Sequence, residues 1–169
     1  PDLILASFHG LPQAYFDKGD PYHCHCMKTA RLLRERLQLP KEKLQVVFQS
    51  RFGKAEWIKP YTQATLEELG HAKTRRVDVI CPGFVADCLE TLEEIAIEGK
   101  QTFMKAGGKD FRYIPCLNDG SGLIRSLTAL VIEQLAGWPT LRPSPAEEAA
   151  RRQALAERAS RAKAQGAAQ

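Results

Sequence analysis

The sequence lacks any long hydrophobic segment. Hydrophobic residues make up 44% of the 169 residues and charged residues 26%, and the two kinds alternate along the chain. A helix that crosses a bilayer needs about 20 consecutive apolar residues, so we predict no membrane-spanning segment. The charged start and apolar core of a secretory signal peptide are missing as well. This composition is typical of a folded globular protein.

The chain also lacks a basic stripe of the kind that binds nucleic acid. Its formal net charge is +4, but residues 140–169 hold six of the 24 basic residues and only three of the 20 acidic ones. The rest of the chain therefore has 18 basic and 17 acidic residues and is almost neutral. We expect no nucleic-acid partner.

The cysteines are few and odd in number. Three of the five adjoin hydrophobic runs, where a free thiol behaves as a small apolar residue. We therefore expect a reduced protein in the cytoplasm. The tract 23–26 (HCHC) resembles a metal-binding sequence, but structural zinc sites space paired ligands about two to four residues apart and need a second pair. A local coincidence is the favoured interpretation.

Two motifs common in α/β enzymes are missing. The first strand-to-helix turn has Gly10 but no Gly-x-Gly-x-x-Gly pattern, which argues against dinucleotide binding. There is no Gly-x-Ser-x-Gly sequence around either Ser7 or Ser50, which argues against an α/β-hydrolase triad.

What is present is an alternation of strand and helix patterns. Short apolar runs rich in β-branched and aromatic residues predict strands over residues 3–8, 44–49, 77–81 and 111–115. Helical spacing of apolar residues follows each run, over residues 29–39, 62–72, 89–106 and 123–135. Such alternation predicts an α/β fold: a Rossmann-like, doubly wound domain with a four-stranded parallel sheet and helices on both faces.

The chain divides by composition near Trp138. We predict an α/β domain over residues 1–138, and a Pro-rich linker with an Ala/Arg/Glu-rich tail over residues 139–169. Beyond the linker, Leu155 is the only large apolar residue, so the tail has little to bury. Its Glu–Arg pairs spaced four apart add only about 0.2–0.5 kcal/mol each, which predicts a marginal helix or a disordered segment. Because the chain starts directly before a strand without an initiator Met, we expect it to be a piece of a longer polypeptide.

Chemically capable side chains follow two of the predicted strands. His9 follows the first run, and Asp87, Glu90 and Glu94 follow the third. The carboxyl ends of parallel strands share one edge of a sheet, so we expect the imidazole to face these carboxylates. The alternative is that Asp87 and Glu90, three residues apart, form a capping box that only satisfies backbone amides. From the residues alone both interpretations stay open.

Five blocks of sequence, in order, closely resemble the ferrochelatase family. They are residues 7–12 (SFHGLP), 19–22 (GDPY), 48–53 (FQSRFG), 57–60 (WIKP) and 82–92 (PGFVADCLETL). The resemblance runs from the first strand to about Gly137 and covers only the C-terminal half of such an enzyme. Ferrochelatases insert ferrous iron into protoporphyrin IX in the last step of haem biosynthesis, in a cleft between two similar Rossmann-like domains.

The resemblance implies roles for particular residues. It gives His9 and Glu90 as catalytic residues, and His9, Glu90, Glu94 and Asp87 as the groups that handle the metal. Trp57 and Phe84 match residues near the porphyrin pocket, and Leu11 is suitable in type for its wall. The resemblance also implies a chelatase-type fold, a missing N-terminal domain of the same polypeptide as partner, and a fragment that is inactive alone.

Two departures from the family pattern are informative. Many relatives carry histidine where this chain has Cys88, which puts metal delivery through that position in doubt. Some members end in a cysteine cluster that holds an iron-sulfur centre, whereas this tail contains no cysteine. We therefore predict no iron-sulfur cluster and no other prosthetic group, the ferrous iron being a substrate.

The residue types suit the chemistry of metal insertion. Removing two pyrrole protons needs a base that works near neutral pH, and a histidine has an ordinary pKa of about 6.5. Carboxylates such as Glu90 and Glu94 offer oxygen ligands to ferrous iron or carry protons away. Two alternatives stay open: a non-catalytic module that binds a tetrapyrrole or metal, and a related chelatase acting on coproporphyrin or cobalt.

Overall fold

The computed structural model describes residues 1–138 and 141–166. Its strands are β1 (Leu3–His9), β2 (Leu44–Gln49), β3 (Arg76–Ile80) and β4 (Asp110–Tyr113). Its α-helices are α1 (Gln13–Asp17), α2 (Tyr22–Arg36), α3 (Thr62–His71), α4 (Leu89–Thr91), α5 (Lys100–Lys105), α6 (Ser121–Gln134) and α7 (Pro145–Ala164). A 3-10 helix, η1 (Lys41–Lys43), precedes β2, and a π-helix, η2 (Leu92–Gly99), joins α4 to α5.

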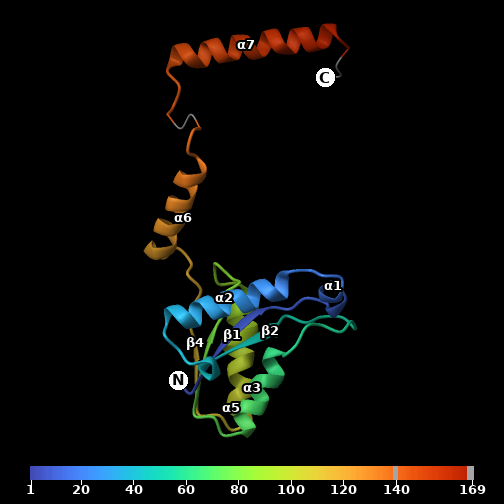
Figure 1. Ribbon diagram of the computed structural model, residues 1–169, viewed down its shortest axis with the longest axis vertical. Coiled ribbons are helices and arrows are strands. Elements are labelled where there is room, and N and C mark those ends of the chain that lie inside the picture. The colour runs from blue at the N-terminus through green and yellow to red at the C-terminus, as the bar shows by residue number, and fades with distance from the viewer. Residues whose placement is uncertain (139–140, 167–169) are drawn as a thin grey trace. The chain divides into compact units, whose positions relative to one another are not determined.

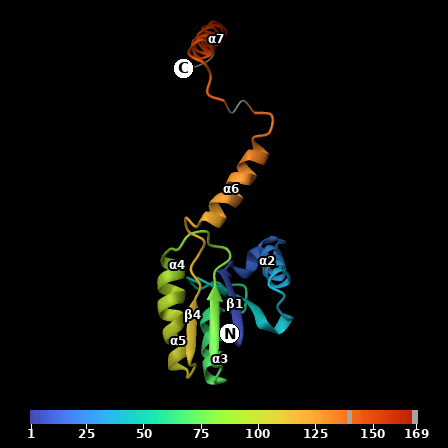
Figure 2. The ribbon, with the colours of Figure 1, turned by 90° about the vertical axis from the view of Figure 1, so that its left-hand side faces the viewer.

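The four strands form one parallel sheet in the order β2-β1-β3-β4. Helix α2 covers one face, and α3 and α5 cover the other (Figures 1 and 2). The predicted fold class, a doubly wound parallel sheet with helices on both faces, is therefore confirmed. Because the chain leaves β1 toward β2 on one side and reaches β3 on the other, the loops after β1 and β3 meet at the switch point of the sheet, where such folds bind ligands.

The alternation of side chains along β1 explains the two layers. Leu5 packs with Leu66 of α3 and Phe103 of α5, whereas Ala6 and Phe8 pack with α2. Successive residues of a strand point to opposite faces, so a continuous apolar run fits a strand that is covered on both sides. These two clusters hold β1 rigidly, and β1 carries His9 at its end.

One predicted boundary was wrong, and the type of one helix was missed. Helix α2 begins at Tyr22, seven residues before the predicted start at 29, because the Asp20 carboxylate accepts a hydrogen bond from the Tyr22 amide at 2.8 Å. The segment predicted as one helix over residues 89–106 is continuously helical through α4, η2 and α5. Its centre, η2, is a π-helix rather than an α-helix. Apolar spacing does not distinguish a π-helix from an α-helix over so few residues.

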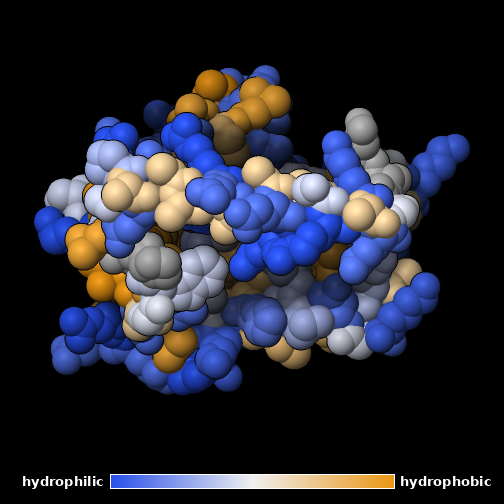
Figure 3. All heavy atoms as spheres, turned by 90° about the horizontal axis from the view of Figure 1, so that it is seen from above, coloured by the Kyte–Doolittle hydropathy of each residue, from blue (hydrophilic) through white to orange (hydrophobic). Residues whose placement is uncertain are grey.

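The chain divides by contacts into two compact units, residues 1–125 and residues from Ser126 onward. In the second unit α7 begins with a capping box between Ser144 and Glu147 and buries no residue. Figure 3, which colours the atoms by hydropathy, shows mostly hydrophilic residues with hydrophobic residues in separate groups. The predicted domain boundary after 138 remains a prediction, since Pro139 and Thr140, where the predicted linker starts, lie outside the described residues.

Among the described helices, none combines the length and apolar character needed to cross a bilayer.

Candidate active site

His9 is the last residue of β1 and stands opposite Gln49 in the sheet register. Its ring Nδ1 lies 2.8 Å from the Gly10 carbonyl oxygen. A carbonyl only accepts, so Nδ1 carries the proton, and in the neutral ring Nε2 keeps a basic lone pair. The Tyr22 hydroxyl donates to the His9 carbonyl oxygen at 2.9 Å. The half-buried imidazole is thus held in the tautomer that a general base needs.

Trp57 packs beside the His9–Gly10 turn. It is 5% exposed, its ring centroid lies 6.3 Å from that of His9, and its Nε1 donates to the Phe52 carbonyl oxygen at 3.1 Å. A Cβ on Gly10 would lie only 2.9 Å from both the Trp57 ring and the Gln49 carbonyl oxygen. The close approach therefore requires glycine at position 10. The role of Trp57 as a porphyrin wall stays a prediction, and its observed contacts support the histidine turn.

Gln49 joins the strand exits, and sequence reasoning assigned it no role. It is 3% exposed at the end of β2. Its Oε1 accepts from the Ser7 hydroxyl at 2.7 Å and from the Cys81 thiol at 3.5 Å, and its Nε2 donates to the Glu90 carbonyl oxygen at 2.6 Å. One amide therefore ties β1, β2, the exit of β3 and helix α4 together. The only sequence signal was an amide at the end of an apolar run.

Glu90 lies in α4, on the same edge of the sheet as His9. The Cys88 thiol, which hydrogen-bonds the carboxylate, lowers the pKa of Glu90 most, followed by the backbone amide of Glu90 itself. A smaller lowering comes from the charge of His9. His9 at the end of β1 and Glu90 in the helix that follows β3 therefore belong to the same edge of the sheet, and their pairing as catalytic residues stays a prediction.

Glu94 lies one turn beyond Glu90, in η2. Its two carboxylate oxygens accept hydrogen bonds of 2.6 Å each, one from the Ser50 amide and one from the Ser50 hydroxyl. A shallow cavity of about 300 Å³ is lined by Glu90, Glu94 and Glu98, with Leu89 and Glu93. Glu90, Glu94 and Glu98, each four residues apart, therefore border one solvent-accessible groove.

Asp87 is fully engaged by protein donors. Its carboxylate accepts from the Tyr113 hydroxyl at 2.5 Å, the Asn118 amide at 2.8 Å, and the Thr91 hydroxyl and Cys116 backbone amide at 3.2 Å each. The hydrogen bonds from Asn118 and Tyr113 hold the pKa of Asp87 well below its usual range. This network ties the exit of β3 to that of β4.

The capping box predicted as the alternative for Asp87 and Glu90 is not formed by those residues. The N-cap of α4 is Cys88, whose amide donates to the Thr91 hydroxyl oxygen at 2.9 Å. The Asp87 carboxylate instead faces Tyr113 of β4 and Asn118 beyond it. Their hydrogen bonds to it are shorter than the one from Thr91 in the first turn of the helix.

The two remaining predicted wall residues lie in separate clusters. Phe84 packs against the cluster of Leu5 and lines an apolar cavity of about 270 Å³. Leu11 packs against the cluster of Phe8. The other residues around the Phe84 cavity are Leu33, Ile80, Cys81, Pro82, Ile114, Pro115, Cys116 and Leu117.

No three His, Cys, Asp or Glu side chains within residues 1–138 and 141–166 converge as ligands of one metal ion. The four predicted metal-handling residues are instead spread along the edge of the sheet, with Asp87 and Glu94 held by protein donors. The tract 23–26 lies on α2, where Cys24 is exposed and Cys26 is buried. A helix directs neighbouring side chains to different sides.

The sequence model of one family, ferrochelatase, matches residues 1–135. The chain belongs to the ferrochelatase family. It is 60% identical to the ferrochelatase of Chromobacterium violaceum over 156 aligned residues. The alignment covers 92% of this chain and 42% of that protein. It is 56% identical over 167 residues to the ferrochelatase of Aromatoleum aromaticum, covering 99% of this chain and 44% of that protein. A third ferrochelatase, from Dechloromonas aromatica, is 60% identical over 139 residues, covering 82% of this chain and 38% of its own length. The chain thus spans about two fifths of the length of these relatives.

Proposed function

We propose that this chain supplies the catalytic residues of a ferrochelatase, which inserts ferrous iron into protoporphyrin IX to make protohaem. The observation that carries the proposal is the pairing of His9 with Glu90 through Gln49. Gln49 stands opposite His9 in the sheet, and its side chain donates to the Glu90 backbone at 2.6 Å. The backbone positions that carry the imidazole and the carboxylate are thereby held at one edge, at the switch point of the sheet.

The reaction exchanges two pyrrole protons for one divalent cation. His9 accepts the two pyrrole protons at Nε2 one after the other and passes the first to solvent before it takes the second, because Nδ1 is occupied by the Gly10 carbonyl. Glu90, kept ionised by its hydrogen bonds, takes the partner role and balances the charge of the incoming ferrous ion. Fixing both groups before the substrates arrive removes the cost of orienting them during the reaction.

The other acids have different parts in this proposal. Glu94 and Glu98 line the same groove as Glu90 and form a path for the cation or for departing protons. Asp87 was predicted to belong to this path. Its four donors leave it little capacity for a metal, so we assign it the positioning of the α4 start.

The remaining partners follow from the family and from the length of the relatives. A further domain of the same polypeptide would complete the porphyrin cleft, with Trp57, Phe84 and Leu11 on this side of it. The reaction would use no iron-sulfur cluster or other prosthetic group, and it would take place in the cytoplasm, where the five free cysteines stay reduced.

A chimera tests this proposal. Residues 1–135 replace the matching segment of the C. violaceum ferrochelatase, and haem formation is followed by absorbance with ferrous iron and protoporphyrin IX under anaerobic conditions. We expect iron insertion by the chimera, and a loss of about 10²-fold or more in kcat for His9→Ala and for Glu90→Gln. The matched controls are His25→Ala and Glu68→Gln, which change exposed residues of α2 and α3.

Each outcome has a distinct meaning. A chimera that binds protoporphyrin but inserts no metal would refute the enzyme and favour a binding module. Insertion of cobalt or use of coproporphyrin in preference to iron and protoporphyrin would assign a related chelatase. Near-normal turnover by His9→Ala or Glu90→Gln would refute that residue's role.

A further inference from the structure

Ser50 holds Glu94 in an unusual arrangement. Both donors of this one residue, the backbone amide and the hydroxyl, reach different oxygens of the same carboxylate at 2.6 Å. Hydrogen bonds to an ionised acceptor are short and strong. A carboxylate offers about four acceptor positions, so this two-point contact, which we call the Ser50 clasp, leaves roughly half of them available.

To make these two hydrogen bonds, Ser50 has a backbone conformation that serine seldom adopts. Ser50 has a φ of +61°, in the left-handed region that non-glycine residues seldom adopt. In this conformation both the amide and the hydroxyl reach Glu94 of η2, directly after the last residue of β2. The surrounding contacts therefore hold a conformation that costs free energy, which is common at functional positions.

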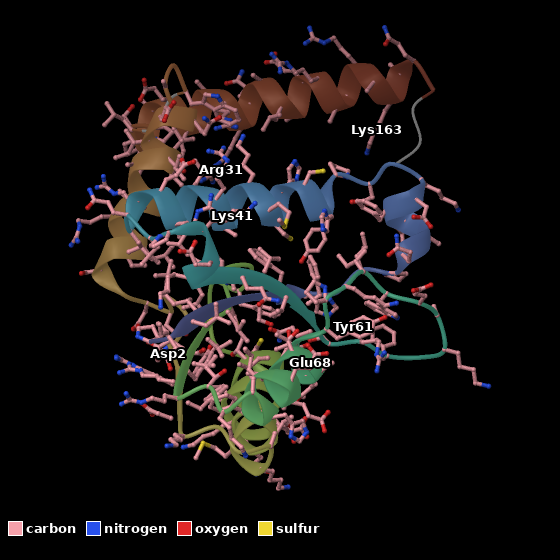
Figure 4. The ribbon with its side chains drawn as sticks, turned by 60° about the horizontal axis from the view of Figure 1, so that its bottom comes forward. Asp2, Arg31, Lys41, Tyr61, Glu68 and Lys163 are labelled. Atoms are coloured by element: carbon pink, nitrogen blue, oxygen red, sulfur yellow. The ribbon has the colours of Figure 1, made fainter. Side chains whose placement is uncertain are left out.

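The segment after Ser50 fixes it from the other side. The Arg51 guanidinium lies over the Tyr61 ring, 4.4 Å from its centroid, and the Tyr61 hydroxyl donates to the Trp57 carbonyl oxygen at 3.1 Å (Tyr61 is labelled in Figure 4). Trp57 in turn packs on Gly10. The same loop therefore contacts the His9 turn at one end and the Glu94 carboxylate at the other.

We propose that Ser50 is a positioning residue for iron insertion: its clasp turns the Glu94 carboxylate so that the remaining lone pairs face the groove shared with Glu90 and Glu98. This inference rests on the proposed function and extends it to a residue outside the acids themselves. A carboxylate that rotates freely presents its lone pairs to the groove only part of the time. A carboxylate held by Ser50 keeps one orientation. It binds a cation with only the acceptor positions that remain, so the cation can bind and then dissociate.

The test uses the active chimera with Ser50→Ala and Ser50→Gly. Both variants remove the hydroxyl, but glycine tolerates the positive φ and alanine does not, so they differ in stability and share the loss of one charged hydrogen bond. We expect both to raise the KM for ferrous iron by about tenfold, the factor that corresponds to one such bond. The KM for protoporphyrin IX should stay within about twofold.

A control and a double-mutant cycle separate positioning from folding. Lys73 has the same φ of +61° at the far end of α3, so Lys73→Gly relieves the same backbone conformation away from the site and should leave both KM values unchanged. In a Glu94→Gln background the effect of Ser50→Gly on the iron KM should vanish, because its target carboxylate is gone.

The failure of this inference differs from the failure of the proposed function. An active chimera in which Ser50→Gly leaves the iron KM unchanged, or changes it equally with and without Glu94→Gln, overturns the role of Ser50 alone. A chimera that inserts no iron at all overturns the proposed function, and the clasp then has no reaction to serve.

Discussion

The Tyr22 hydroxyl donates a hydrogen bond of 2.9 Å to the backbone carbonyl oxygen of His9. The tyrosine belongs to the first turn of α2 and the histidine to the end of β1, so this bond joins the helix that covers one face of the sheet to the residue proposed as the base. Burial is the main cause of the raised pKa of Tyr22, which keeps the hydroxyl protonated and able to donate.

Replacing Tyr22 with phenylalanine should lower the free energy of unfolding by about 1 kcal/mol, the usual net value of one hydrogen bond. The ring and its packing are kept, whereas the bond to His9 and the interaction of the hydroxyl with the Cys26 thiol are lost. Urea denaturation of the chain measures the difference. Tyr15→Phe, at a residue 55% exposed, is the control. An equal effect of the two substitutions would contradict a role for this bond.

Gly10→Ala should destabilise the chain by about 1–3 kcal/mol, the usual cost of overpacking. The new Cβ would lie 2.9 Å from the Trp57 ring and from the Gln49 carbonyl oxygen, so one of them must move. Thermal unfolding followed by circular dichroism gives the result. Gly122→Ala adds a Cβ that meets nothing within 4 Å and should not destabilise. If both variants melt at the same temperature, the close approach at Gly10 is not a constraint.

Asp87→Asn should make stability less dependent on pH in the acid range. The pKa of Asp87 is lowered in the folded chain, mainly by Asn118 and Tyr113, whereas an unfolded aspartate titrates near pH 3.9, about its ordinary value. Its contribution is therefore present above that pH and is lost as the pH falls below it. We expect the free energy of unfolding to fall more steeply from about pH 5 to about pH 3 in the wild type than in the variant.

Asp119→Asn is the control for this comparison, because Asp119 is exposed in the same loop region. The measurement is urea denaturation at several pH values, with the slope in each chain compared. Identical slopes in the wild type and in Asp87→Asn would show that the network around Asp87 does not favour its charged form.

The cysteines should differ widely in reactivity. Burial is the main cause that raises the pKa of Cys81 to about 12, so almost no thiolate is present at pH 8, whereas Cys24 is exposed. Since the thiolate is the nucleophile, iodoacetamide should label Cys24 first and Cys81 last in a time course followed by mass spectrometry. Labelling in urea should remove the difference. Rapid labelling of Cys81 in the native chain would contradict its burial.

Removing residues 144–169 should leave the cooperative unfolding of the chain unchanged within about 0.5 kcal/mol, as for other changes that disturb no buried contact. Helix α7 buries none of its residues and is capped by its own Ser144–Glu147 pair. Differential scanning calorimetry of the shortened and complete chains makes the comparison. A clearly lower melting temperature after truncation would reveal stabilising contacts of α7.

The strands were predictable because short apolar runs bounded by turn residues are typical of buried strands in a chain of this composition. Each of the four observed strands lies within two residues of its predicted bounds. The helix boundaries were harder, since α2 starts at a side-chain contact from Asp20 that apolar spacing does not report. The π-helix was missed for the same reason: its hydrogen bonds shift by one residue while its apolar residues keep nearly the same spacing.

The site was predictable only in part. His9 and the acids after β3 were expected at one edge, since the topology of a parallel sheet requires it. Gln49 and Ser50 received no role, because amide and hydroxyl side chains at a strand end are common and their partners are more than 40 residues away in sequence. Asp87 was grouped with Glu94, although its carboxylate is directed to β4.

The sequence by itself determined the order of strands and helices, the nearly neutral body of the chain and the kinds of chemical group at each strand exit, because these depend on local pattern and composition. The tertiary structure decided which donor each carboxylate meets. That choice depends on distances of a few tenths of an ångström between segments far apart in the chain: Ser50 lies within 2.6 Å of Glu94, and Tyr113 with Asn118 surrounds Asp87. Hydrogen bonds weaken steeply with distance and angle, so only the packed sheet fixes which acid is held and which is left to face the groove.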